Sequence, residues 1–235
     1  MISTLERKKI RLAKSFLPPF GAEMKKYDEL YQRFCREGYT SELCEAYADS
    51  FVDNCKKPAA DDIIQLASMY GKIHDYKNSE FYLDMLSQKK MNNDDKYNYC
   101  LEQISTSAKQ MHWRDAEDFR TENINFIQTY MQKKTPSQQV DMYIALALVD
   151  CAAKRFSDAF SLLNFGYKPN GKNDEKLLSI MITAVYFYSA VGDEESLNTA
   201  VENANSCLKL FSKFEFEWSR EYYQKCIIDA SNGIL

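Results

Sequence analysis

The sequence is short of the residues that bend or break a chain: its 235 residues include only 7 glycines and 5 prolines. Sandwiches and barrels need many tight turns, and long disordered segments are rich in the same residues, so both are excluded. The longest apolar run, residues 181–191, is too short to cross a membrane and is bounded by charge. We interpret this run as a buried helix.

Histidine is almost missing, with only His74 and His112, 38 residues apart. The cysteines are scattered and form no CxxC pair: Cys35, Cys44, Cys55, Cys100, Cys151, Cys207 and Cys226. No ligand set at metal-binding spacing results. No P-loop, GxGxxG or GxSxG motif occurs. We therefore predict a protein that is not an enzyme, with no metal and no cofactor.

The overall charge is modest, with a net value of -4 and no general basic character. Seven unpaired cysteines in apolar surroundings are typical of core packing in a reducing compartment. The first twenty residues contain charges throughout and lack the apolar centre of a secretory signal. We therefore expect an intracellular, cytoplasmic protein.

Hydrophobic residues recur at helical spacing along nearly the whole chain, in runs of about 12 to 20 residues. Several runs begin with hydrogen-bond acceptors, as at Ser41, Asp61–Asp62 and Asp94–Asp95, where free backbone N–H groups need them. The breaks alternate between tight turns and longer segments with Pro, Asn or Gly. This alternation predicts helix-turn-helix pairs joined by looser linkers.

The tight turns recur at a regular interval. Each of the first three turns is followed by an aromatic residue and, three places later, by a small one: Tyr76 and Ser79, Trp113 and Ala116, Phe156 and Ala159. In the fourth turn Glu194 and Leu197 occupy the same two places. The second members of the pairs are 37, 43 and 38 residues apart. Such a period indicates a helical repeat.

These units resemble the tetratricopeptide repeat (TPR) family. The stretch IIQLASMYGKIHDYKNSEFYLDML has Leu66–Ala67, Tyr70, Asp75–Tyr76 and Ser79 in register, and MITAVYFYSAVGDEESLNTAVENA has Ala184–Val185, Tyr188 and Gly192–Asp193. The second unit keeps Trp113 and Ala116 but has Gln103 in place of Leu; the third keeps Leu146–Ala147, Phe156 and Ala159 but has Asp150 in place of Tyr. The resemblance implies an all-α fold, a right-handed α-α superhelix or TPR-like solenoid.

The expected organisation is one continuous solenoid domain in four parts. These are a basic amphipathic helix and Pro break at 1–21, a degenerate helical pair at 22–59 turning at Gly38–Tyr39, TPR-like repeats at 60–211, and an aromatic capping helix at 212–235.

The resemblance also implies a partner-binding surface, because helix-A residues between the packing positions line the concave face in this family. On this match they are Ile64, Ser68, Leu101, Ser105, Ile144, Leu148, Ile182 and Tyr186. Family members that bind acidic chaperone C-terminal tails have Lys, Asn and Arg there, so such tails are not expected as partners. An apolar groove suits a peptide or partner helix, which implies a protein–protein interaction scaffold or adaptor. The alternative interpretation, with equal weight, is that the groove is filled by longer helices, by the C-terminal segment or by a second copy of the chain in a homodimer.

The marked basic segment is ERKKIRLAK, residues 6–14. Its candidate contacts to an anionic surface are Arg7, Lys8, Arg11 and Lys14. The favoured interpretation is that its apolar face caps the first repeat while the basic face is solvated. The alternative is a regulatory protein that uses this helix to associate with a membrane or nucleic acid.

His74 and Asp75 stand where the Gly-Asp turn of the family belongs. We expect Asp75 to accept hydrogen bonds at the start of the second helix. With His74 in place of glycine, the sequence predicts either a left-handed backbone at that residue or a wider turn.

Overall fold

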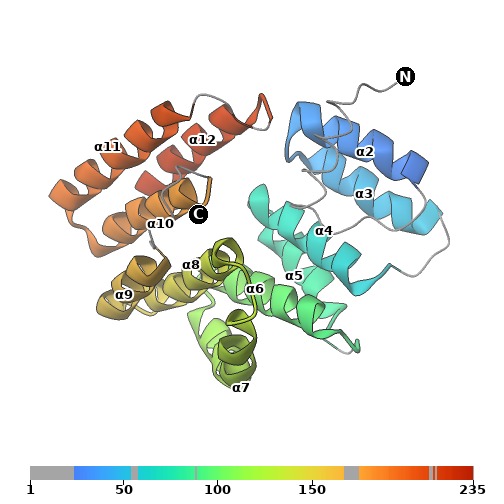
Figure 1. The fold of residues 1–235 in the computed structure, drawn as a ribbon, viewed down its shortest axis with the longest axis horizontal. Helices are drawn as coiled ribbons and strands as arrows, with labels where there is room; N and C mark the ends of the chain where they lie inside the picture. The colour runs from blue at the N-terminus through green and yellow to red at the C-terminus, as the bar shows by residue number, and fades with distance from the viewer. Residues whose placement is uncertain are drawn as a thin grey trace. The chain divides into compact units, whose positions relative to one another are not determined.

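A computed structural model describes residues 24–53, 58–87, 89–166, 175–211, 214 and 216–234, with the side chains of 24–28 and 51–53 left aside. Within these ranges all regular structure is helical, with eleven helices and no strand (Figure 1). The all-α prediction is confirmed. No described helix is both long enough and apolar enough to cross a membrane.

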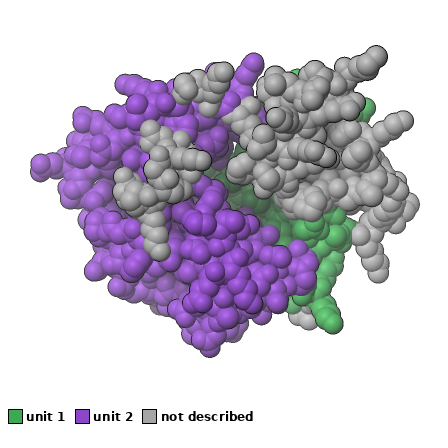
Figure 2. Space-filling model, in the orientation of Figure 1, with its two compact units in different colours: residues 1–91 green, residues 92–235 purple. Residues whose placement is uncertain are grey.

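The chain divides into two compact units, residues 1–91 and residues 92–235, coloured separately in Figure 2. The first contains α2 (Met24–Glu37), α3 (Ser41–Asp53), α4 (Ala60–Lys72) and α5 (Tyr76–Asp84). The second contains α6 (Asn93–Lys109), α7 (Trp113–Met131), α8 (Pro136–Ala152), α9 (Phe156–Gly166), α10 (Glu175–Val191), α11 (Glu194–Leu210) and α12 (Ser219–Ser231). The boundary falls within residues 60–211, where the repeats are expected.

Four helix pairs, α4–α5, α6–α7, α8–α9 and α10–α11, are joined by the same turn. One residue of each turn has a positive φ: His74 at 61°, Met111 at 63°, Lys154 at 60° and Gly192 at 78°. The next N–H then donates to the carbonyl oxygen five residues earlier, as from Asp75 to Tyr70 at 3.0 Å. This is the Schellman closure of a helix C-terminus. Of the two alternatives expected at His74, a left-handed backbone or a wider turn, the structure shows the left-handed backbone.

The second helix of each pair begins at the residue that follows the turn in the repeat register: Tyr76, Trp113, Phe156 and Glu194. Three places later, Ser79, Ala116 and Ala159 are completely buried. Asp75 accepts a hydrogen bond from the Asn78 N–H at 3.2 Å, as expected for a helix N-cap. The turn chemistry and the small residue after it therefore set where each pair closes.

The helices of the second unit pack in an alternating pattern. The even-numbered helices contact in succession, α6 with α8, α8 with α10 and α10 with α12, and each odd-numbered helix contacts the even-numbered helices before and after it. The core of this unit includes Ile104, Met142, Val149, Leu178 and Val185, all completely buried. In the first unit, α3 contacts α2 and α4, and α4 contacts α5.

The last helix, α12, packs against α10 and α11. Arg220 donates to the backbone carbonyls of Leu208 at 3.2 Å and Phe211 at 2.6 Å, near the end of α11. Its guanidinium also lies 5.1 Å from the ring centre of Phe214. A cation at a helix C-terminus is favourable because the last carbonyl groups there have no partner within the helix.

Candidate functional site

The eight residues predicted for a concave surface lie within or beside the packed interior. Ile64, Leu148, Ile182 and Tyr186 are buried, whereas Ser68, Leu101, Ser105 and Ile144 are half-buried. Ile64 and Ser68 belong to the first unit and the other six to the second. In this conformation a partner can reach only the four half-buried side chains, so the concave site stays a prediction.

The four basic residues proposed to contact an anionic surface, Arg7, Lys8, Arg11 and Lys14, lie outside the described residues. The whole expected segment 1–21 lies outside them as well.

His74 and three buried cysteines are part of the local structure and packing. His74 Nδ1 lies 2.9 Å from the Tyr76 hydroxyl, beside the turn that both residues form. Burial raises the pKa of the Cys44 and Cys151 thiols to about 12, and that of Cys100 to about 11. A thiol with such a pKa is almost never a thiolate near neutral pH and is a poor nucleophile. Within the described ranges, no three His, Cys, Asp or Glu side chains gather as they would around a metal ion.

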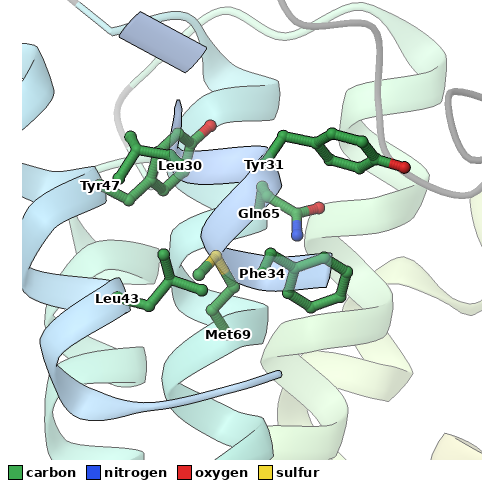
Figure 3. A pocket seen from close by; sticks show the side chains of 7 residues that line it. All are labelled: Leu30, Tyr31, Phe34, Leu43, Tyr47, Gln65 and Met69. Carbon is green, nitrogen blue, oxygen red and sulfur yellow. The ribbon is translucent and has the colours of Figure 1, made fainter. Parts of the chain in front are cut away.

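Two hollows differ greatly in size. The first, between α2, α3 and α4, is lined by Leu30, Tyr31, Phe34, Leu43, Tyr47, Gln65 and Met69 (Figure 3). Its volume is about 30 Å³, which corresponds to one water molecule. It is far smaller than the α9–α11 hollow described next.

The second hollow, which we call the α9–α11 groove, has a volume of about 470 Å³. That volume falls in the range of ligand-binding pockets. Its lining comes from three helices: Phe160, Leu163 and Asn164 of α9; Ile180, Met181, Ala184, Phe187 and Tyr188 of α10; and Glu195, Ser196, Thr199, Ala200 and Asn203 of α11. Both α9 and α11 contact α10, and they do not contact each other (Figure 1).

The floor of the groove is apolar and partly open. Met181, Ala184 and Tyr188 lie on one stripe of α10, since they are three and seven residues apart, and all three are half-buried. Phe160 of α9 is 46% exposed beside this stripe. Its ring centre lies 6.1 Å from that of Phe187, which is buried beneath it. An exposed aromatic ring held by a buried one offers a fixed apolar contact to a partner.

The α11 wall is polar. Asp193 caps the helix by accepting a hydrogen bond from the Ser196 N–H at 3.1 Å, and the hydrogen bonds with Ser196 lower the pKa of Asp193. Thr199 and Asn203 continue the wall one and two turns further. Glu195 is the charged member of the lining, which contains no Lys or Arg. The groove thus combines an apolar floor with one polar, negatively charged edge.

A separate ionic network lies between α7 and the α8–α9 turn. Asp150, which is 3% exposed, accepts hydrogen bonds from Arg155 Nε at 2.9 Å and from Arg120 Nη1 at 3.0 Å. Glu117 forms ion pairs with Arg120 at 2.6 Å and with Arg155 at 2.9 Å. Asp150 stands where the TPR family has Tyr, so a packing residue is replaced here by an ionic contact between neighbouring helix pairs.

The comparisons with known proteins leave the site to be interpreted from its geometry. No family model matches the chain, and no curated protein or solved structure matches it.

The pattern of the sequence did not reveal the α9–α11 groove. One signal was available: Phe160 follows Ala159 directly and so lies outside the buried stripe of α9 that contains Ala159 and Leu163. A single exposed aromatic residue is common on protein surfaces, however, and indicates a site only when the neighbouring helices are known.

Proposed function

We propose that the protein is a non-catalytic, cytoplasmic scaffold of the TPR-like solenoid type, which binds a helical segment of another protein. The repeated turn supports this proposal: four helix pairs close with the same backbone geometry at His74, Met111, Lys154 and Gly192. The alternating contacts of α6 to α12 are those that stacked helix pairs make.

The observation that carries the proposal is the open apolar strip of α10 between two helices that do not touch. A helix is about 10 Å across with its side chains. Laid over α10, a partner helix would contact Phe160 on one side and Thr199 on the other. Its apolar face would cover Met181, Ala184 and Tyr188, which is the helix-in-groove mode of recognition.

Site-specific photo-crosslinking in the native cell tests this function. A crosslinking amino acid at Asn203, in the groove wall, is compared with the same amino acid at Asn125, which is exposed on α7 and does not line the groove. We expect one defined adduct from position 203 and none from position 125. The groove-filling substitution Ala184→Phe should abolish that adduct. The same adduct from both positions, or an adduct that Ala184→Phe leaves unchanged, would place the binding surface elsewhere.

A further inference from the structure

We propose that the helix bound by the α9–α11 groove is amphipathic and basic, with two Lys or Arg residues seven positions apart that face Glu195 and Glu202. This inference rests on the proposed function and concerns the partner's chemistry.

Glu195 and Glu202 form a pair of matched charges on one flank of α11. Seven residues are two helical turns, so the two carboxylates are about 10.5 Å apart along the helix. Both side chains are exposed. Glu195 lines the groove, and Glu202 is the direct neighbour of Asn203, which lines it as well.

These two charges are not neutralised by the described part of the protein. Neither carboxylate forms an ion pair or a side-chain hydrogen bond with a described residue. Two cations near the ends of the adjoining helices are already engaged. Arg155 is held by Asp150 and Glu117, and Lys176 contacts Asp141 with Nζ–O distances of 2.5 and 2.6 Å. The exposed Lys209 follows on the same flank two turns after Glu202, so the negative charge is confined to the Glu195–Glu202 part of the α11 edge, where it repels acidic partners.

The opposite edge differs, and this difference orients the partner. On α9 the edge consists of Phe160, Asn164 and the exposed Ser157, none of which is charged. A partner helix with one basic flank therefore places that flank toward α11. A spacing of seven residues is the same in both chain directions, so the charges select a flank and leave the direction of the helix open.

The apolar floor supplies the contact area and the carboxylates supply discrimination. Exposed ion pairs contribute modestly, so two of them favour a basic over a neutral partner by about tenfold in Kd. Because both carboxylates are exposed, dissolved salt screens this preference strongly.

The test uses the full-length protein and two synthetic amphipathic peptides of identical Leu/Phe face. One peptide has Lys at two flank positions seven residues apart, and the other has Glu at those positions. Fluorescence anisotropy measures both Kd values at low and at high ionic strength. We expect the Lys peptide to bind at least tenfold more tightly at low salt. The difference should be smaller at 0.5 M salt, because the Debye length falls to about 4 Å there.

The variant Glu195→Gln with Glu202→Gln should remove the preference for the Lys peptide. The control Asp118→Asn with Glu122→Gln changes the net charge equally at exposed positions of α7, away from the groove lining, and should retain it. Circular dichroism checks that both variants are folded. Equal affinity for the two peptides, or a Lys preference that the Glu195/Glu202 variant retains, overturns the inference. The crosslink from position 203 would survive that outcome, so the proposed function is judged separately.

Discussion

Replacing Asp150 with Asn tests the ionic network that joins α7 to the α8–α9 turn. The Asp150 side chain is almost completely enclosed, while Arg120 and Arg155 are 19% and 33% exposed. Asn has nearly the same shape as Asp and removes only the charge. The substitution therefore leaves the packing intact and leaves Glu117 as the remaining anion shared by the two guanidinium groups.

The expected loss follows from this partial exposure. Breaking a fully buried ion pair costs about 3–5 kcal/mol, and one hydrogen bond to a charged group contributes about 1.5–3 kcal/mol. Water still reaches Arg120 and Arg155, and Glu117 remains beside both. We therefore expect Asp150→Asn to lower the free energy of unfolding by about 2–3 kcal/mol.

Urea denaturation of the full chain, followed by circular dichroism, measures this loss. If the two units unfold in separate steps, the change belongs to the transition of residues 92–235. Glu117→Gln is the matched control, because its side chain is 28% exposed and should cost only about 0.5–1 kcal/mol. An Asp150→Asn loss no greater than that of Glu117→Gln would refute the reasoning.

Three further predictions concern the turns, the thiols and one surface carboxylate. Lys154 has a φ of 60° and is exposed, so Lys154→Gly should stabilise the protein by about 1 kcal/mol and raise Tm by about 2–4 °C. Gly192→Ala should destabilise the protein by a similar amount. Calorimetry measures both changes, and a Tm decrease for Lys154→Gly would contradict the assignment of a strained turn. Iodoacetamide at pH 8 should alkylate Cys44, Cys100 and Cys151 only after unfolding, because burial raises their pKa values to about 12, 11 and 12. Peptide mass spectrometry measures the labelling, and rapid labelling of any of the three in the native protein would contradict the prediction. The hydrogen bond from Lys134 lowers the pKa of Asp94 below 3.8. The stabilisation from this pair is therefore present above pH 3.8 and is lost as the pH falls through the lowered pKa. NMR titration should show that Lys134→Met returns the pKa of Asp94 to its ordinary value, and an unchanged pKa would exclude Lys134 as the cause.

The turns could be predicted because their information is local. A helix C-terminus, a left-handed residue and an N-cap all lie within about six residues, as from Tyr70 to Asp75. The same sequence also marked Asp150 as unusual in its repeat. It could not reveal why, since Arg120 lies 30 residues earlier and meets Asp150 only when α7 packs against α8.

The partner surface was harder to predict for a related reason. Repeat register tells which residues of a helix lie between its packing positions, but not whether the next helix pair covers them. Ile182 and Tyr186 are buried in this way, in a helix that contacts four others. Sequence periodicity therefore identified residues that face neighbouring helices and left open whether the surface is free.

The amino acids of α10 give the strongest argument that the uncovered strip is functional. The run 181–191 is apolar on all sides, as a buried helix should be, and α10 contacts α8, α9, α11 and α12. Within 180–188, the residues that these contacts leave half-buried are Met181, Ala184 and Tyr188, and all three line the groove. Packing alone would tolerate a polar residue at such a position, so Ala184→Ser should change the free energy of unfolding by no more than about 0.5 kcal/mol. If the strip serves a partner helix, Ala184→Phe should remain folded and lose the adduct at position 203, while Ala184→Ser keeps both.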